Sequence, residues 1–300
     1  MGAGDPRAGV RHVRRGTDLP VLLPAADRLA ERVRREREVG APIPQLRARH
    51  GVWLVGILVL SAGVAQAQTG AATESVLAIL LKWTPLLFQG FIFNLAISFL
   101  AMAGGTAVGT ALGLWQISLL PPVRAGSWLV TQFFRNAPWL VLLFFCMFLM
   151  PFQIKIFGLV IPLPDWVKAT FGLALPVMAN VSELVRGAIQ SIPSGQWESA
   201  ESLAFNRRQT LWMIILPQCV KRMLPPWMNL YAILTMATVL ASVVGVSEVM
   251  TLTGRVLSAE GGRTDLLVPF YSYILLWFFL YCYPIALLTV RLERRFAVKS

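Results

Sequence analysis

Residues 191–226 read SIPSGQWESAESLAFNRRQTLWMIILPQCVKRMLPP and lie between two long apolar segments. The first part, 195–204, is small and acidic, and we expect it to form a short helix. Asn206 is a good N-cap residue for a second helix that runs through Thr210, and we expect Pro217 to end that helix. Two short helices joined by an elbow of small residues would present a knob to a groove on a soluble partner. We therefore call residues 191–226 the docking loop.

The chain on both sides of the docking loop is too apolar for a soluble globule. Of its 300 residues, 56% are hydrophobic and 14% are charged, and the mean hydropathy is +0.63. An ordinary soluble domain has about 25% charged residues, and a helix needs about 20 apolar residues to cross a bilayer. Six candidate spans lie near 51–68, 84–114, 128–150, 166–190, 227–251 and 266–290. The sequence therefore predicts an all-α, polytopic membrane helical bundle with five core spans plus one N-terminal extra span.

The N-terminal part has a different composition. Residues 1–50 hold eleven arginines and six carboxylates, and we interpret them as a basic cytoplasmic arm. The arm either is attracted to anionic lipid headgroups or is a solvated tail. The segment 51–68 ends in Ala-Gln-Ala before Gln68, a pattern that is typical of a cleavable signal. Because a leader of fifty residues is long for a signal, we predict an extra transmembrane span, with a signal-like segment as the alternative.

The basic residues are distributed unevenly between the two sides of the membrane. With six spans and an internal N-terminus, 21 Lys and Arg residues fall on the cytoplasmic side and 5 on the outside, while Arg135 stays within a span. Cytoplasmic loops of membrane proteins carry an excess of Lys and Arg. The distribution therefore predicts a cytoplasmic C-terminus.

Several kinds of chemistry are excluded by residues that the sequence lacks. Its three cysteines are far apart, and its two histidines both lie in the arginine-rich arm, so neither a zinc site nor a histidine-based catalytic triad is expected. No lysine follows a glycine, so there is no phosphate-binding loop of the Walker A type. We expect no metal in this chain, no nucleic-acid partner and no nucleotide hydrolysis.

The docking loop resembles the EAA loop of ABC-transporter permeases, in which E-A-A is followed after three residues by G and after nine more by I-x-L-P. Here Glu198 opens the triplet ESA, Ala204 stands at the glycine position, and IILP follows at 214–217 with the spacing kept throughout. Because the glycine is replaced, we expect the elbow to form without a positive-φ glycine and with help from Asn206, a residue type that tolerates that region.

Other segments resemble the polar amino-acid permeases of the histidine and glutamine type. FFRNAPWLVLLFF at 133–145 is similar to their F-R-(G/N)-T-P-L-L-V-Q-L-F-F stretch. ELVRGAIQ at 183–190, ASVVGVSEV at 241–249 and LERRF at 292–296 are similar to further stretches of the same subfamily. The resemblance covers roughly residues 84–298.

One departure concerns a charged pair. The subfamily commonly has K-D-T-S-L in its fourth core helix, where this chain has TMATV at 235–239. A charged pair within the membrane is expensive and usually functional. Its absence either argues against a zwitterionic substrate bound at that point or indicates that this chain is the non-binding half of a heterodimer.

The resemblance implies a type I ABC-importer permease domain over 84–298, with residues 191–226 as the loop that couples it to an ATPase. It implies three kinds of protein partner: ABC ATPase subunits, a periplasmic solute-binding protein, and a second permease chain in a homo- or heterodimer. The partner subunit would use the ATP, so this chain would need no cofactor and would not be an enzyme. The location implied is the bacterial inner membrane, crossed several times and surrounded by lipid. The solute would be a polar amino acid or a related small compound such as an opine.

Two sets of residues carry these hypotheses. The ATPase-coupling set follows the EAA pattern and consists of Glu198, Ala200, Ala204, Ile214, Leu216 and Pro217. The substrate-path set collects polar side chains in or near the spans, namely Arg135, Asn180, Thr235, Thr238, Ser242 and Glu248. Alternatives stay open for the second set. Arg135 either faces the substrate path, pairs with Glu183 or extends its side chain to the cytoplasmic face. Glu248 either touches the solute or the binding protein, or it caps a helix at the surface. The hydroxyl groups of the threonine and serine residues either line the path or bond back to helix carbonyls.

Two further alternatives concern the docking loop and the class of protein. Arg207 and Arg208 either contact the ATPase or simply follow the positive-inside bias. An ion-coupled secondary transporter is the alternative function, and it should show paired broken helices and intramembrane carboxylates. A membrane-embedded enzyme would need convergent His, Asp or Glu side chains within the spans, which the composition disfavours.

Overall fold

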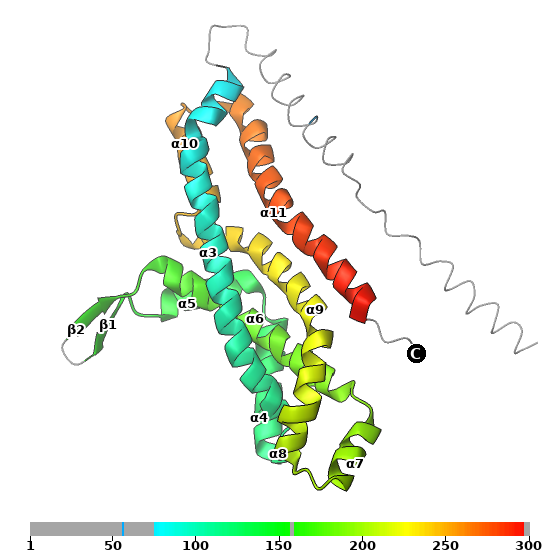
Figure 1. Ribbon diagram of the computed structural model, residues 1–300. Coiled ribbons are helices and arrows are strands. Elements are labelled where there is room, and N and C mark those ends of the chain that lie inside the picture. Colours follow the sequence, from blue (N-terminus) through cyan, green and yellow to red (C-terminus); the bar gives the residue numbers. More distant parts are fainter. Residues whose placement is uncertain (1–55, 57–74, 157–158, 297–300) are drawn as a thin grey trace, which may run out of the picture. The chain divides into compact units, whose positions relative to one another are not determined.

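The computed structural model describes residue 56 and residues 75–156 and 159–296. The predictions for the arm 1–50 and, apart from Gly56, for the segment 51–68 lie outside the described residues. The long helices are α3 (Val76–Gln116), α4 (Pro121–Asn136), α5 (Trp139–Leu149), α6 (Asp165–Gln190), α9 (Leu216–Ala237), α10 (Val249–Ala259) and α11 (Leu267–Phe296) (Figure 1). The short elements are the helices α7 (Ser194–Ser202) and α8 (Arg207–Gln209), the π-helical η1 (Thr210–Ile215), the 3₁₀ segments η2 (Thr238–Val244) and η3 (Thr264–Leu266), and the strands β1 (Gln153–Ile156) and β2 (Leu159–Pro162).

Within the described residues, the expected spans are present as helices, but they are not all continuous. Three helical stretches, at 76–116, 207–244 and 264–296, are long and apolar enough to cross a membrane, and the pair α4 and α5 forms a fourth if it is counted as one broken span. The predicted span 166–190 coincides with α6, which is not among these three stretches. The structure thus supports a multi-pass helical protein with three to four such spans among the residues it describes.

The predicted span 128–150 is broken in its middle. The axes of α4 and α5 differ by 105° across a break at Ala137 and Pro138. Proline disfavours the α conformation of the residue before it, and Ala137 accordingly has an extended backbone with ψ 136. The continuous helix expected here is therefore wrong, and the local reason is Pro138.

The predicted span 227–251 also ends early. The α9 helix stops at Ala237 and continues as the 3₁₀ segment η2, which ends at Gly245 with φ 88. A left-handed C-cap of this kind is readily adopted by glycine and terminates the helix. The chain then turns into α10, which begins after its N-cap residue Glu248.

A small hairpin departs from the all-α prediction. The strands β1 and β2 pair antiparallel, with Ile154 opposite Ile161 and Lys155 opposite Val160. β-Branched residues favour extended backbone, and three of these four residues are of that type. The hairpin connects α5 to α6 and is visible in Figure 1 as the pair of arrows beyond α5.

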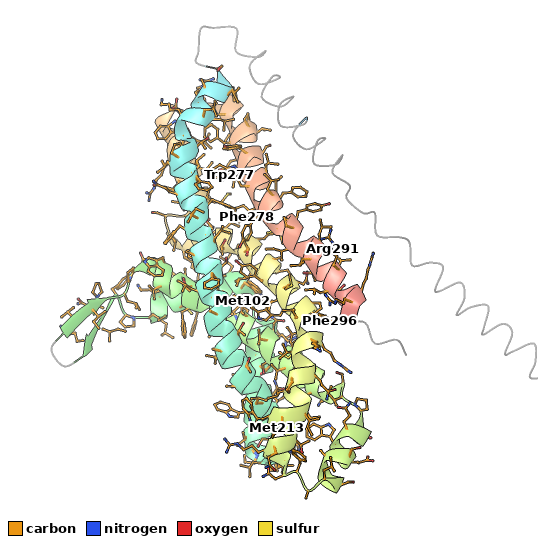
Figure 2. The ribbon with its side chains drawn as sticks, viewed as in Figure 1. Met102, Met213, Trp277, Phe278, Arg291 and Phe296 are labelled. Carbon is orange, nitrogen blue, oxygen red and sulfur yellow. The ribbon has the colours of Figure 1, made fainter. Side chains whose placement is uncertain are left out.

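The long helix α3 packs against different partners along its length. Its first half shares a buried cluster with α10 and α11, in which Phe91 contacts Trp277 and Phe278. Figure 2 labels these last two side chains on α11. Its second half shares a cluster with α6, in which Ile97 and Met102 are buried. α3 therefore takes part in both clusters, and the second cluster also contains residues of α6 and α9.

Glycines allow α3 and α6 to approach closely. A Cβ atom at Gly105 would lie 2.5 Å from Val177, one at Gly109 would lie 2.5 Å from the carbonyl oxygen of Met178, and one at Gly113 would lie 2.7 Å from that of Ser182. Small residues four apart form a ridge that lets helix backbones touch. These glycines therefore join α3 and α6 into a tightly packed pair.

Candidate functional site

The first part of the docking loop forms the predicted short helix, α7. Ala200 is buried, with 2% of its surface exposed, and faces the core, whereas Glu198 is exposed. Among the described residues, no hydrogen bond or ion pair engages the Glu198 carboxylate. The helix α7 thus packs against the core through Ala200 and exposes the Glu198 carboxylate on another face, where a soluble partner could bind it.

The elbow after α7 is a Schellman motif in which alanine occupies the position that glycine usually takes. The backbone N–H of Phe205 donates to Ala200 O at 3.1 Å, and that of Ala204 donates to Glu201 O at 2.9 Å. Ala204 has φ 58 and is the one non-glycine residue with positive φ among the described residues. The expected help from Asn206 is wrong, because Asn206 has φ −74 and Ala204 itself adopts the left-handed conformation.

Asn206 is confirmed as an N-cap. Its Oδ1 accepts from the backbone N–H of Gln209 at 2.9 Å, while Gln209 Oε1 accepts from the backbone N–H of Asn206 at 2.9 Å. This reciprocal capping box satisfies two donors that the first helical turn leaves without partners. The second helix of the docking loop therefore begins where the sequence predicts.

The prediction that Pro217 ends this helix is wrong. Pro217 lies in the first turn of α9, and the chain stays helical from α8 through η1 into α9. The π-helical turn shifts the bonding pattern by one residue, since the N–H of Leu216 donates to Leu211 O. Pro217 therefore lies inside a continuous helical stretch, directly after the π-helical turn.

The coupling residues contact the core to different degrees. Ile214 and Leu216 are half-buried and Pro217 is exposed, while Ile215 and Cys219 between and after them are fully buried. The sequence pattern did not single out Ile215. The EAA pattern selects residues by their spacing in the sequence, whereas burial depends on which side of η1 and α9 faces the core.

A second feature is a cavity of about 280 Å³ between α4, α6 and α9, which we call the polar pocket. Its lining includes two residues of the predicted substrate path, Arg135 and Asn180. The other lining residues are Glu183, Leu184, Pro226, Asn229, Leu230 and Ile233. Its volume is close to the lower end of the range of about 300–1,000 Å³ that small-molecule sites occupy.

Charges in the polar pocket are arranged around Glu183. Arg186 Nη2 lies 2.6 Å from Glu183 Oε2, Arg135 Nη1 lies 3.6 Å from the same oxygen, and Gln132 Nε2 donates to Oε1 at 3.4 Å. The Arg135 side chain is 46% exposed and that of Glu183 is 13% exposed. A guanidinium carries five N–H donors, so Arg135 keeps donors for an anionic group in the cavity. The pairing of Arg135 with Glu183, left open by the sequence, is confirmed.

The remaining residues of the predicted path lie outside the lining of the polar pocket. Thr235, Thr238 and Ser242 donate their hydroxyl hydrogens to the carbonyl oxygens of Tyr231, Thr235 and Val239 at 2.9, 2.7 and 2.7 Å. Thr235 and Thr238 are fully buried. These hydroxyls therefore show the local helix bonding that was the alternative to a path role.

Glu248 also lies away from the pocket lining and is fully buried. Its Oε2 accepts from Asn94 Nδ2 at 2.9 Å, and its Oε1 accepts from the N–H of Thr251 at 3.0 Å. Asn94 in turn accepts from the N–H of Val249 at 3.1 Å and donates to Thr238 at 3.0 Å. The carboxylate thus caps α10 in the interior rather than at the surface.

Sequence reasoning did not assign a role to Asn94 or Asn229, and it mentioned Glu183 only as a partner of Arg135. A signal was present for Asn94, because a lone carboxamide in an apolar span needs hydrogen-bond partners. The same signal marks Asn229 in the predicted span 227–251, and the packing of α9 beside α6 places it in the lining of the polar pocket.

Comparison with known proteins gives consistent results. The sequence profile of the family described as "Binding-protein-dependent transport system inner membrane component" matches residues 121–298. The probable amino-acid ABC transporter permease protein YckA of Bacillus subtilis is 32% identical over 71% of this chain and 90% of its own length. The glutamine transport system permease protein GlnP of Escherichia coli is 27% identical over 71% of this chain and 94% of its own length.

A solved structure shares the fold. A crystal structure of an amino acid ABC transporter with histidines has a TM-score of 0.62 at 24% identity, covering 74% of this chain and 99% of that chain. At this identity the likeness concerns the fold alone. The profile match extends over more than half of the chain, and the YckA match over most of both proteins. The chain belongs to the family of inner membrane components of binding-protein-dependent transport systems and is a transport permease of the amino-acid ABC type rather than an enzyme.

Proposed function

We propose that this chain is the permease subunit of an ATP-driven importer for polar amino acids or related small solutes such as opines. The observation that carries the proposal is the juxtaposition of Arg135 and Glu183, 3.6 Å apart, in a cavity of about 280 Å³. A zwitterionic solute carries one group of each sign. Its carboxylate would meet Arg135, and its ammonium group would share the Glu183 carboxylate with Arg186. The named functions of YckA and GlnP support the same class of solute.

The missing charged pair at 235–239 fits this proposal in one of two ways. Thr235 and Thr238 are buried and bonded to helix carbonyls, so we do not assign solute contacts to them. Either the polar pocket supplies the charges instead, or a different second permease chain does so in a heterodimer. Uptake by the purified transporter distinguishes the two, because in the second case changes in the pocket of this chain leave uptake unaltered.

We assign the coupling to ATP hydrolysis to the docking loop. The exposed Glu198 carboxylate and the elbow at Ala204 would meet a groove of an ABC ATPase subunit, which would hold and hydrolyse the ATP. A periplasmic solute-binding protein and a second permease chain would complete the assembly in the bacterial inner membrane. The C-terminus would lie in the cytoplasm, consistent with the 21 to 5 distribution of basic residues, and the chain itself would carry no cofactor.

The polar pocket is tested by uptake into proteoliposomes that contain the complete transporter, with a panel of labelled polar amino acids. Replacing Arg135 by Gln removes the cation and should raise the KM for uptake by about tenfold, the effect of one charge-assisted hydrogen bond. Arg124→Gln is the matched control, because Arg124 is an exposed arginine on the same helix and does not line the pocket. Equal KM values for both variants would remove the pocket from the transport path.

The docking loop is tested in the same system. Truncating the carboxylate by Glu198→Ala, or enlarging the elbow by Ala204→Leu, should abolish the stimulation of ATP hydrolysis by solute while the complex still assembles. Intact stimulation in both variants would contradict the assignment of the loop. If no ATPase copurifies with the chain and uptake follows an ion gradient, the function is that of a secondary transporter.

A further inference from the structure

Two arginines attach the docking loop to the ends of core helices. Arg207 opens α8, and its Nη2 donates a hydrogen bond of 3.1 Å to the carbonyl oxygen of Ile117, the C-cap residue of α3. Arg222 in α9 donates through Nη1 to both the carbonyl oxygen and the hydroxyl oxygen of Ser191, each at 2.8 Å. Ser191 is the C-cap residue of α6. The same arrangement therefore occurs twice, at the ends of two helices that are far apart in the sequence.

The chemistry of a helix end explains why arginine suits these positions. The last carbonyl groups of a helix lack intrahelical partners, and together they carry about half a negative charge. A guanidinium that donates to such a carbonyl makes a charge-assisted hydrogen bond, which is stronger and more directional than a neutral one. Each arginine therefore holds its helix by a defined bond at the end nearest the docking loop.

The two attached helices form one mechanical unit. α3 and α6 pack so closely that a Cβ atom at Gly109 would lie 2.5 Å from Met178 O. α6 also contributes Asn180 and Glu183 to the polar pocket. Glu183 precedes Ser191 by eight residues, which corresponds to about 12 Å along a helix axis. A displacement applied at Ser191 would therefore reach the pocket through two turns of continuous helix.

The neighbouring arginine is placed differently. Arg208 borders a cavity of about 470 Å³ that is also lined by Trp212 and Met213. Both of these large apolar side chains are exposed, and Met213 is labelled in Figure 2. Arg208 thus belongs to the outward surface of the docking loop, whereas Arg207 binds inward to α3. The bond from Arg207 to α3 is a role that neither of the two alternatives from the sequence included.

We propose that Arg207 and Arg222 are positioning residues for energy coupling, which transmit movement of the docking loop to α3 and α6 and so to the polar pocket. The inference rests on the proposed coupling role of the loop. It goes beyond that role by naming the bonds inside the chain through which the movement passes. Neither arginine needs to touch the solute or the ATP.

The test measures ATP hydrolysed per solute molecule transported, using the complete transporter with its ATPase and binding protein in proteoliposomes. Arg207→Ala and Arg222→Ala should each raise this ratio by about tenfold, because uptake falls while hydrolysis continues. The thermal unfolding midpoint and the amount of copurified ATPase should stay at wild-type values. Arg222→Lys should restore most of the coupling, since an ammonium still donates to the Ser191 carbonyl.

Lys221→Ala serves as the control, because Lys221 is an exposed cation beside Arg222 and no hydrogen bond engages its side chain among the described residues. The ratio in this variant should equal that of the wild type. The proposal is overturned if the two alanine variants keep the wild-type ratio, if Lys221→Ala raises the ratio equally, or if the arginine variants lose assembly rather than coupling. A wild-type complex without solute-stimulated ATP hydrolysis would be a separate result, which contradicts the proposed function itself.

Discussion

Asn94 Nδ2 donates a hydrogen bond of 2.9 Å to Glu248 Oε2, and both side chains are fully buried. The two residues lie 154 positions apart in the sequence, and their bond joins α3 to the start of α10. Asn94 Nδ2 also donates to Thr238, the third member of the cluster. A buried carboxylate is costly unless hydrogen bonds satisfy it, and here backbone and side-chain donors converge on it. The cluster therefore joins α3, η2 and the start of α10.

Replacing Asn94 by Leu should destabilise the protein by about 2–3 kcal/mol, because a buried carboxylate then loses its side-chain donor. Chemical unfolding in detergent micelles measures the change. Asn136→Leu is the control, since Asn136 is exposed and should change stability by less than about 0.5 kcal/mol. Glu248→Gln keeps the shape and an acceptor and should transport normally. Loss of transport in a fully stable Glu248→Gln protein would instead assign Glu248 to the solute path.

Replacing Ala204 by Gly should stabilise the docking loop. An L-residue in the left-handed conformation costs about 1–2 kcal/mol, and glycine adopts it freely, although the flexibility of glycine in the unfolded chain offsets part of the gain. The expected net effect on the free energy of unfolding is therefore a gain of up to about 1 kcal/mol. Glu201→Gly in the same helix is the contrast and should cost about 1 kcal/mol. A loss of stability in Ala204→Gly would contradict the Schellman geometry of the elbow.

The glycine ridge gives a matched pair within one helix. Gly109→Ala places a Cβ atom 2.5 Å from Met178 O and should destabilise the protein by about 1–3 kcal/mol through overpacking of α3 against α6. Gly104→Ala meets nothing within 4 Å and should be neutral or stabilising by up to about 1 kcal/mol, because alanine is the better helix former. The unfolding midpoints of the two variants in detergent provide the measurement. Equal midpoints would mean that α3 and α6 are farther apart than described.

Glu260 should contribute a pH-dependent part of the stability. Trp83 Nε1 donates to Glu260 Oε1 at 2.7 Å and Lys82 Nζ at 3.2 Å, and these hydrogen bonds lower the pKa of the Glu260 carboxyl below its usual value. A lowered pKa in the folded state means that the contribution is complete above the unfolded pKa of about 4.3 and is lost as the pH falls through the folded pKa.

The unfolding midpoints of the wild type and of Glu260→Gln, compared from neutral pH to acid, measure this contribution. The difference between them should be constant above about pH 5.5 and should shrink below about pH 4.3, where the wild type loses the ionised carboxylate. A difference that grows toward acid would reverse the sign and would mean that the pKa is raised instead.

The spans and the docking loop could be predicted because their signals are local. Runs of apolar residues predict α3 and α11, and the spacing from Glu198 to Pro217 predicts the family. The N-cap role of Asn206 was predicted, and its partner Gln209 lies within one turn of it. Pro138 is a local signal for the break between α4 and α5, and Gly245 is one for the end of η2. Both residues lie inside apolar runs, and those runs by themselves predict continuous spans.

The candidate site could be predicted only in part. Arg135 and Asn180 were singled out as polar residues in apolar segments, and they do line one cavity. Thr235, Thr238 and Ser242 have the same polarity and the same kind of surroundings in the sequence, yet their hydroxyls bond to helix carbonyls and lie outside the pocket lining. Whether a polar residue lines the pocket depends on which face of α9 and η2 points toward α6. The sequence of a span that is apolar on all sides does not indicate which of its faces is buried.

By itself the sequence determined that the chain crosses a membrane as helices, that a docking loop separates two of them, and to which family the chain belongs. These properties follow from hydropathy, spacing and local capping, each of which acts over a few turns of helix. Only the tertiary structure decided that Arg207 and Arg222 bind the ends of α3 and α6, that Asn94 holds Glu248, and that Arg135 and Glu183 share a cavity. Such contacts join residues up to 154 positions apart, and they depend on how the helices pack against one another, which no local pattern specifies.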